Sequence, residues 1–318
     1  MVDTSSTALF YTLAVIISVG VVGNVISLVV FHRGKQSSSL AWSAYFKCLA
    51  LADNFILLVL GMELLLVLSP ANIYVRFHNE WLCKFFHCIC YFGITTSTWI
   101  MVVMTVDRTL SLCFPLKFRI DTSAKWIYIK ICCVLLALLG ISLFHLTVVT
   151  YGFGFCYVIL RDTFSAIYFH WYIPVLVFIV PFVINGACNT IIVCTLWKRA
   201  RRTAALSEQS IGRRVNAAQN FTFRVLAITI FHMVSVLPYG IFQLMFYFKI
   251  PVSQSEFIIT NVIFNLNSGV NFFLYLAAGG DFRSDLKELC KSLWVCCKPT
   301  ESNNINGTRV STITDTVQ

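Results

Sequence analysis

Long apolar segments alternate with short polar breaks along almost the whole chain. A helix of about 20 residues crosses the roughly 30 Å hydrocarbon layer of a bilayer. Seven segments reach that length, and in chain order they are Leu9–Phe31, Trp42–Leu68, Phe85–Cys113, Trp126–Thr150, Phe169–Leu196, Val225–Phe248 and Phe257–Ala277. The breaks carry basic residues or turn formers, as in "HRGKQSSS" and "KIPVSQSE". The pattern predicts an all-α integral membrane protein built as a seven-transmembrane helix bundle.

Composition and charge agree with this assignment and give it an orientation. Of the 318 residues, 58% are hydrophobic and 12% are charged, whereas about 25% charged residues are usual in a soluble domain. All but four of the 24 Lys and Arg fall on one side of the predicted bundle, the four exceptions being Arg76, Lys84, Arg161 and Lys249. Short basic loops stay cytoplasmic, which predicts an extracellular N-terminus and a cytoplasmic C-terminus in the plasma membrane. The net charge of +10 therefore reports topology, and no nucleic-acid partner is expected.

Polar side chains inside the apolar segments are the first candidates for function, because ionisable groups at membrane depth are costly and tend to be functional. At a rise of about 1.5 Å per residue, Asp53, Asn24, Ser97 and Asn271 all lie roughly 13–17 Å from the cytoplasmic face. One carboxylate surrounded by hydroxyl and amide oxygens fits a small-cation site or a proton-linked polar network. Interhelical hydrogen bonding alone, at about 0.6 kcal/mol per bond, is the structural alternative.

The third segment carries landmarks at both of its ends. Cys83 and Arg108 are 25 positions apart, which corresponds to about 37 Å of helix. A cysteine at the outer mouth is a disulfide candidate, and Cys156 is the only cysteine in the outer loop between the fourth and fifth segments. Near the C-terminus, Cys296 and Cys297 follow the amphipathic stretch "DFRSDLKELCKSLW". They are candidates for palmitoylation, with two unmodified thiols as the alternative.

These features together resemble the rhodopsin-like (class A) G protein-coupled receptors over residues 8 to 297. The resemblance rests on motifs in the family's order: "GN" at Gly23–Asn24, "LALAD" ending at Asp53, "DRT" at Asp107–Thr109, "PL" at Pro115–Leu116, Pro181, "LPY" at Leu237–Tyr239, "NSGVNFFLY" at Asn267–Tyr275 and "FR" at Phe282–Arg283. It implies that residues 1–297 form the receptor domain, including a short cytoplasmic amphipathic helix 8. Residues 298–318 are expected to form a disordered cytoplasmic tail, in which Thr308, Ser311, Thr312 and Thr314 are candidate phosphorylation sites for arrestin recruitment.

The resemblance also implies roles for particular residues. The family's sodium-pocket positions, whose occupancy favours the inactive state, are matched by Asp53, Ser97, Asn267, Ser268 and Asn271. No other cofactor is implied. The family's G protein-coupling positions are matched by Asp107, Arg108 and Tyr275. The sequence departs from the family at four further positions. Val236 stands where the family usually has tryptophan, and Phe272 stands where it usually has proline. Asn189 and Thr109 each stand where it usually has tyrosine. No acidic residue at the start of helix 6 is available to pair with Arg108, so the family's aromatic switch and ion lock are not expected here.

A ligand pocket is expected at the outer ends of the helices. Cys90 stands where amine receptors have aspartate and Asn265 where retinal proteins have lysine, so neither ligand class is supported. The candidate pocket residues are Glu63, Cys90, Tyr91, Tyr239, Phe242, Gln243, Asn261 and Asn265. Glu63 is either a counter-ion for a basic ligand group or a side chain that snorkels to the interface. "WLCK" at residues 81–84, the proline-free "NFFLY" and the missing tryptophan are similar to invertebrate neuropeptide receptors of the FMRFamide-like type, whose ligands end in Arg-Phe-amide.

Other classes of membrane protein are less well supported. A secondary transporter is expected to show internal repeats or paired broken helices, and the two halves of the chain share no repeat. A zinc hydrolase needs clustered ligands, but the six histidines are scattered in depth. An enzyme is therefore not expected. The sequence predicts a receptor that binds an extracellular peptide or small ligand and activates a heterotrimeric G protein; the alternative is a diverged chemosensory or orphan receptor with weak or no coupling.

Overall fold

The structure is a computed structural model that describes most of the chain. The described residues are 4–35, 42–69, 73, 79–114, 123–152, 155–158, 163–164, 168, 171–172, 174–204, 212–248 and 250–297. Pro115, Leu116 and the predicted tail with its phosphorylation sites lie outside these ranges. Cys296 and Cys297 lie within the last helix, but their side chains are not described.

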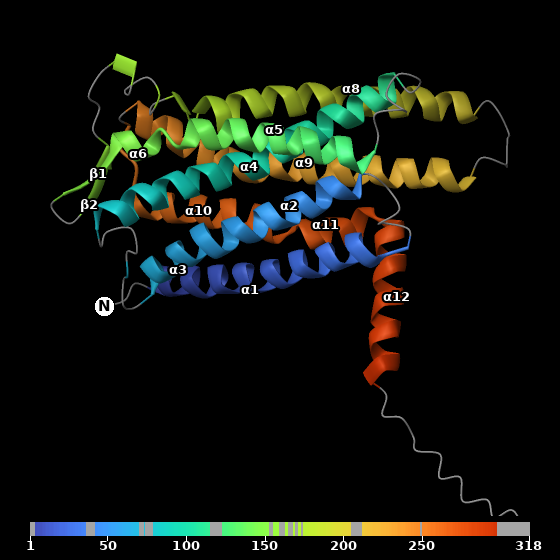
Figure 1. Ribbon diagram of the computed structural model, residues 1–318, viewed down its shortest axis with the longest axis horizontal. Helices are drawn as coiled ribbons and strands as arrows, with labels where there is room; N and C mark the ends of the chain where they lie inside the picture. The colour runs from blue at the N-terminus through green and yellow to red at the C-terminus, as the bar shows by residue number, and fades with distance from the viewer. Residues whose placement is uncertain are drawn as a thin grey trace, which may run out of the picture.

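Helices dominate the described residues and lie almost parallel in one bundle (Figure 1). In chain order they are α1 (Thr4–Arg33), α2 (Ser43–Ile56), η1 (Leu57–Gly61), α3 (Met62–Leu68), α4 (Glu80–Cys113), α5 (Ala124–Ser142), α6 (His145–Val148), η3 (Pro174–Ile179), α8 (Val180–Ala204), α9 (Gly212–Tyr247), α10 (Gln254–Gly269), α11 (Asn271–Ala278) and α12 (Gly280–Cys297). The segments η1 and η3 are π-helical. Only α12 lies across the bundle instead of along it (Figure 1).

The membrane-spanning pattern matches the one expected from the sequence. Among the described residues, six helical stretches are long and apolar enough to cross a bilayer, and α10 with α11 forms a seventh span that bends by 47° between Gly269 and Asn271. The chain is thus a multi-pass membrane protein with a seven-helix bundle, and α12 corresponds to the predicted helix 8. The bend at Val270 occurs without a proline, and this interruption of the seventh span was not predicted.

One end of the bundle, here called the hairpin end, carries a small β-hairpin that the all-α prediction lacked. Strand β1 (Val149–Gly152) pairs antiparallel with β2 (Phe155–Val158), with Tyr151 opposite Cys156. A disulfide joins Cys156 to Cys83 in the first turn of α4, with 5.9 Å between the Cα atoms. The predicted disulfide is therefore present, and it fastens the hairpin to the start of α4.

Local hydrogen bonds explain where two helices begin at the hairpin end. The Asn79 side chain accepts a hydrogen bond of 2.8 Å from the Leu82 N–H and caps α4. Ser253 and Glu256 form a reciprocal capping box at the start of α10, with distances of 3.1 and 2.7 Å. Such caps satisfy backbone N–H groups that the first helical turn leaves unpaired.

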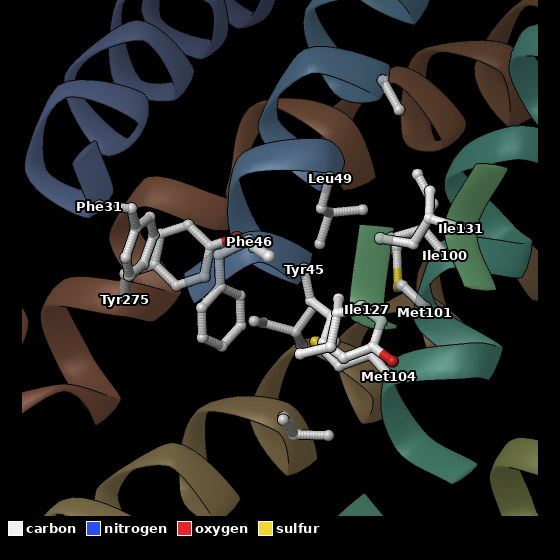
Figure 2. Close-up of a cluster of buried hydrophobic side chains, with 14 of the residues drawn as sticks. Phe31, Tyr45, Phe46, Leu49, Ile100, Met101, Met104, Ile127, Ile131 and Tyr275 are labelled. Carbon is white, nitrogen blue, oxygen red and sulfur yellow. The ribbon is translucent and has the colours of Figure 1, made fainter. Parts of the chain in front are cut away.

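The opposite end, here called the α12 end, is filled by a buried aromatic and aliphatic core (Figure 2). Tyr275 of α11 contacts the rings of Phe31, Phe46 and Phe282, with centroid distances of 5.1, 5.2 and 5.5 Å. These rings come from α1, α2, α11 and α12, so they join the ends of three spans to the transverse helix.

Candidate functional site

A cavity of about 250 Å³ opens at the hairpin end between the second, third, sixth and seventh spans. Its lining combines apolar side chains with one carboxyl and two amide groups: Leu60, Glu63, Leu64, Val67, Ile94, Tyr239, Phe257, Asn261, Phe264 and Asn265. Four of the eight predicted pocket residues, Glu63, Tyr239, Asn261 and Asn265, lie in this lining. An apolar cavity with a few convergent polar groups is the usual form of a small-ligand or peptide side-chain site.

Glu63 is the only acidic side chain in the cavity lining, and it is 4% exposed. It lies two residues after the π-helical turn of residues 57–61, a kind of irregularity that is frequent at functional sites. The burial of Glu63 rules out the snorkelling arrangement. The Glu63 carboxyl group therefore faces the cavity from inside the bundle.

The amide of Asn265 faces the same cavity. Its nitrogen donates to the Asn261 carbonyl oxygen at 2.9 Å, while its own oxygen has no hydrogen-bond partner among the described residues. A Cβ atom at Gly61 would lie 2.9 Å from that oxygen, so the glycine makes room for it. Sequence analysis missed Phe257 and Phe264; Phe257 precedes Asn261 and Asn265 by four and eight positions, and the helical period identifies it.

The remaining predicted pocket residues lie in two other places. Phe242 and Gln243 line a neighbouring depression of about 350 Å³ that shares Phe257 with the first cavity. Cys90 and Tyr91 lie outside both linings. Tyr91 stacks on His145 with 4.5 Å between ring centroids, so its ring packs against α6.

A buried polar cluster surrounds Asp53, between the cavity and the α12 end of the bundle. Its two carboxylate oxygens accept hydrogen bonds of 2.8 Å from the Ser97 hydroxyl and 2.6 Å from the Asn271 amide. Asn24 donates to the Ser268 carbonyl oxygen at 3.0 Å, and the Ser268 hydroxyl lies beside Asp53. All five residues are at most 2% exposed, so α1, α2, α4, α10 and α11 converge on one carboxylate.

Asn267 is turned away from this cluster. Its side-chain oxygen accepts a hydrogen bond of 3.1 Å from Ser235 of α9, and its side chain lies beside that of His232, which is also in α9. The structure therefore brings together Asp53, Ser97, Ser268 and Asn271 of the five predicted sodium-pocket residues, whereas Asn267 links the seventh span to the sixth.

The donor set around Asp53 fits a small hard cation. Carboxylate, hydroxyl and amide oxygens are the ligands that such cations prefer. Among the described residues, no group of three His, Cys, Asp or Glu side chains is placed to hold a metal ion. Any cation here would depend on one carboxylate, supported by the Ser97 and Ser268 oxygens.

At the α12 end, Asp107 and Arg108 have partners that sequence analysis did not identify. Asp107 accepts hydrogen bonds from the Tyr45 hydroxyl of α2 and, at 2.7 Å, from the Lys130 ammonium of α5. The Arg108 Nε donates to the Thr222 hydroxyl of α9 at 2.8 Å, and its guanidinium lies 5.9 Å from the Trp42 ring centroid. A threonine hydroxyl thus tethers α4 to α9, whose sequence from Gly212 to Tyr247 contains no acidic residue.

The third predicted coupling residue, Tyr275, is fully buried among the rings of the α12-end core. Its hydroxyl has no hydrogen-bond partner in the described part of the chain. Lys130 and Tyr45 could not be found from the sequence because each lies on a different helix from Asp107, and only the bundle packing brings them together.

Comparison with known proteins identifies the class of this membrane protein. The model of the family "7 transmembrane receptor (rhodopsin family)" matches residues 23–275. The chain therefore belongs to the rhodopsin family of seven-transmembrane receptors, which confirms the resemblance found in the sequence and the expectation of a non-enzymatic protein.

Individual relatives are peptide receptors at modest identity. The chain is 23% identical to the isotocin receptor of Catostomus commersonii over 89% of this chain and 78% of that receptor. It is 24% identical to the FMRFamide receptor of Drosophila melanogaster over 86% of this chain and 53% of that protein. Identity to the oxytocin receptor of Ovis aries is 25%, over 71% of this chain and 64% of the relative.

Proposed function

We propose that this protein is a plasma-membrane receptor that binds an extracellular peptide and activates a heterotrimeric G protein by movement of α8 and α9. The carrying observation is that α9 takes part in both sites: Tyr239 lines the cavity, and Thr222 holds Arg108. These two residues are 17 positions apart, or about 25 Å along the helix. A ligand that contacts one end of α9 can therefore bias the position of the other through a population shift.

In this proposal the hairpin end faces outward and the α12 end faces the cytoplasm. The distribution of Lys and Arg supports this orientation. In this orientation the Cys83–Cys156 disulfide would lie in the oxidising compartment, where such bonds persist. Cys296 and Cys297 would lie at the cytoplasmic surface, where palmitoylation would anchor α12.

The ligand is proposed to carry a basic group that pairs with Glu63. Aromatic lining by Tyr239, Phe257 and Phe264 suits an aromatic neighbour of that basic group, as in a peptide ending in Arg-Phe-amide. The Drosophila relative is named for such a peptide. The volume of about 250 Å³ accommodates one or two ligand side chains, and the adjoining depression beside Phe242 and Gln243 would receive the rest of the peptide.

Sodium is proposed to bind at Asp53 and to favour the closed bundle. The physical support is the single buried carboxylate with hydroxyl oxygens from two other helices. Agonist affinity is then expected to fall as sodium concentration rises, and Asp53→Asn should abolish this dependence. Potassium at equal ionic strength is the control, because it changes screening equally without fitting a sodium-sized site.

A peptide-library screen with second-messenger readouts tests the function directly. Cells expressing the receptor should respond to basic, C-terminally amidated peptides, and Arg108→Ala should remove the response while binding persists. Glu63→Gln should weaken basic peptides selectively. Glu80→Gln is the matched control, since Glu80 lies at the same end but is 53% exposed and pairs with Lys84. An unchanged response of Glu63→Gln to basic peptides would refute the role of Glu63.

A diverged chemosensory or weakly coupling receptor is the second candidate. The observation in its favour is the set of departures from the family pattern, above all Val236, which is buried at 4% exposure where a tryptophan is usual. Responses to small odorants or lipids without peptide responses would support a chemosensory role. Ligand binding without an Arg108-dependent signal would support a non-coupling receptor, and no arrestin recruitment is then expected.

A further inference from the structure

Arg224 of α9 is a fully buried cation near the α12 end of the bundle. It is 1% exposed and is the largest of the side chains that are less than 2% exposed. Burying a guanidinium removes hydration that must be replaced by paired charges and hydrogen bonds. The residues that surround Arg224 therefore determine whether this end of α9 can stay where it is.

The described surroundings of Arg224 include groups from α2, α12 and the α11–α12 junction. Its guanidinium donates to the Asp281 carboxylate of α12 at 3.3 Å, and the guanidinium carbon lies 5.8 Å from the Phe46 ring centroid of α2. The stem of the side chain lies against the α11–α12 junction, where a Cβ atom at Gly279 would be 3.1 Å from the Arg224 Cδ. Phe46 belongs to the aromatic core drawn in Figure 2.

Two side chains within one turn of α9 form bonds to two different neighbouring helices. Thr222 bonds Arg108 of α4, and Arg224 bonds Asp281 of α12. Residues two positions apart in a helix point about 200° away from each other, since each residue turns the helix by about 100°. The end of α9 is thus held between α4 on one side and α12 on the other, and it cannot leave the bundle without breaking the Arg224–Asp281 pair.

A second ion pair on α12 has a different environment. Lys35, just after α1, pairs with Glu288, and their side chains are 78% and 52% exposed. Exposed pairs of this kind contribute little because water solvates both charges. The Arg224 and Asp281 side chains are only 2% and 17% exposed, so water solvates their charges poorly. Separating this pair therefore costs more free energy than separating Lys35 from Glu288.

We propose that Arg224 and Asp281 form a latch that holds the sixth span against the transverse helix α12 in the closed receptor. The latch rests on the proposed function in that the opening it opposes is the α9 movement that admits the G protein. Both residues act as positioning residues: they set the closed position of α9 and do not themselves contact the ligand.

Distance measurements on the purified full-length receptor test the latch without reference to signalling. Spin labels are attached at Phe223→Cys and Lys287→Cys in a background whose exposed native cysteines are replaced by serine. Asp281→Asn and Arg224→Gln should each raise the fraction of long distances about tenfold, within the usual range of conformational coupling. Glu288→Gln is the matched control on the same helix and should leave the distribution unchanged.

The double variant Arg224→Gln with Asp281→Asn separates a paired latch from two independent effects. If the two residues act as a pair, the double variant opens no further than either single variant. Multiplying effects, or unchanged distances in both single variants, would overturn the latch. Nucleotide exchange on added G protein is recorded in parallel. If the variants lengthen the distance between the spin labels without speeding exchange, the latch is retained and the proposed G protein coupling is refuted. Failure of the latch can therefore be told apart from failure of the proposed function.

Discussion

Asn185 of α8 offers a sharp test of how buried amides act in this bundle. Its side chain is fully buried, and neither the amide nitrogen nor the amide oxygen has a hydrogen-bond partner among the described residues. It lies beside a groove between α8 and α9 that is lined almost entirely by apolar side chains, including Phe178, Val236 and Leu237. We predict that Asn185→Leu stabilises the receptor.

The size of the effect follows from the missing partners. An unsatisfied buried polar group costs about 1–3 kcal/mol, and polar bonds between membrane helices average only about 0.6 kcal/mol because the unfolded chain also finds partners. Replacing Asn185 by leucine should therefore gain about 1 kcal/mol. For a chain of 318 residues that corresponds to a rise of about 1–2 °C in melting temperature.

Asn189, one turn further along the same helix, is the matched control. Its side-chain oxygen accepts a hydrogen bond of 3.0 Å from Thr229 of α9, so Asn189→Leu removes a real partner and should lower the melting temperature. Thermal unfolding of both variants in the same detergent gives the comparison. A fall in melting temperature for Asn185→Leu as large as that for Asn189→Leu would refute the reasoning, because it would mean that the Asn185 amide is satisfied.

Three further variants test contacts at other levels of the bundle. Thr222→Val removes the hydroxyl that accepts from Arg108, a bond to a charged group of about 1.5–3 kcal/mol, and ligand-independent signalling should rise several-fold in a second-messenger assay. Gly20→Ala should lower the melting temperature because the new Cβ would lie 2.7 Å from the Gly269 Cα. Gly140→Ala is the control: its Cβ would have no atom within 4 Å, so the melting temperature should stay the same or rise. Cys83→Ser breaks the disulfide to Cys156 and should cost about 2–5 kcal/mol, measured as lost surface expression against Cys113→Ser.

The spans and the Asp53 cluster could be predicted because both depend on quantities that the sequence carries directly. Apolar length gives the spans, and depth along a helix places Asp53, Ser97 and Asn271 at one level. Helix rotation is the quantity that depth does not give. Asn267 and Asn271 share a face by spacing, yet the bend at Val270 separates them, so Asn271 bonds Asp53 while Asn267 bonds Ser235.

The partners at the α12 end could not be predicted for a different reason. Lys130, Arg224 and Asp281 read as topology charges or as the surface of an amphipathic helix, because the sequence does not say which spans are neighbours. Their roles emerge only when Lys130 meets Asp107 and Arg224 meets Asp281 across helices. The β-hairpin escaped prediction because its strands are only four residues long and because β1 begins at Val149, inside the apolar segment predicted as the fourth span; the end of that predicted span is therefore wrong.

The bend in the seventh span shows how packing replaces a missing proline. A proline would remove one backbone hydrogen bond and force a kink, but here Phe272 occupies the expected position. Phe272 lies against Gly23 of α1, where a Cβ atom would be only 2.9 Å from the phenylalanine Cβ, and Asn271 is drawn to the Asp53 carboxylate at 2.6 Å. These two contacts hold adjacent residues of the bend against α1 and α2, so we expect the bend to depend on the Asp53 cluster. It follows that Asp53→Asn, which weakens the bond from Asn271, should also loosen the bend.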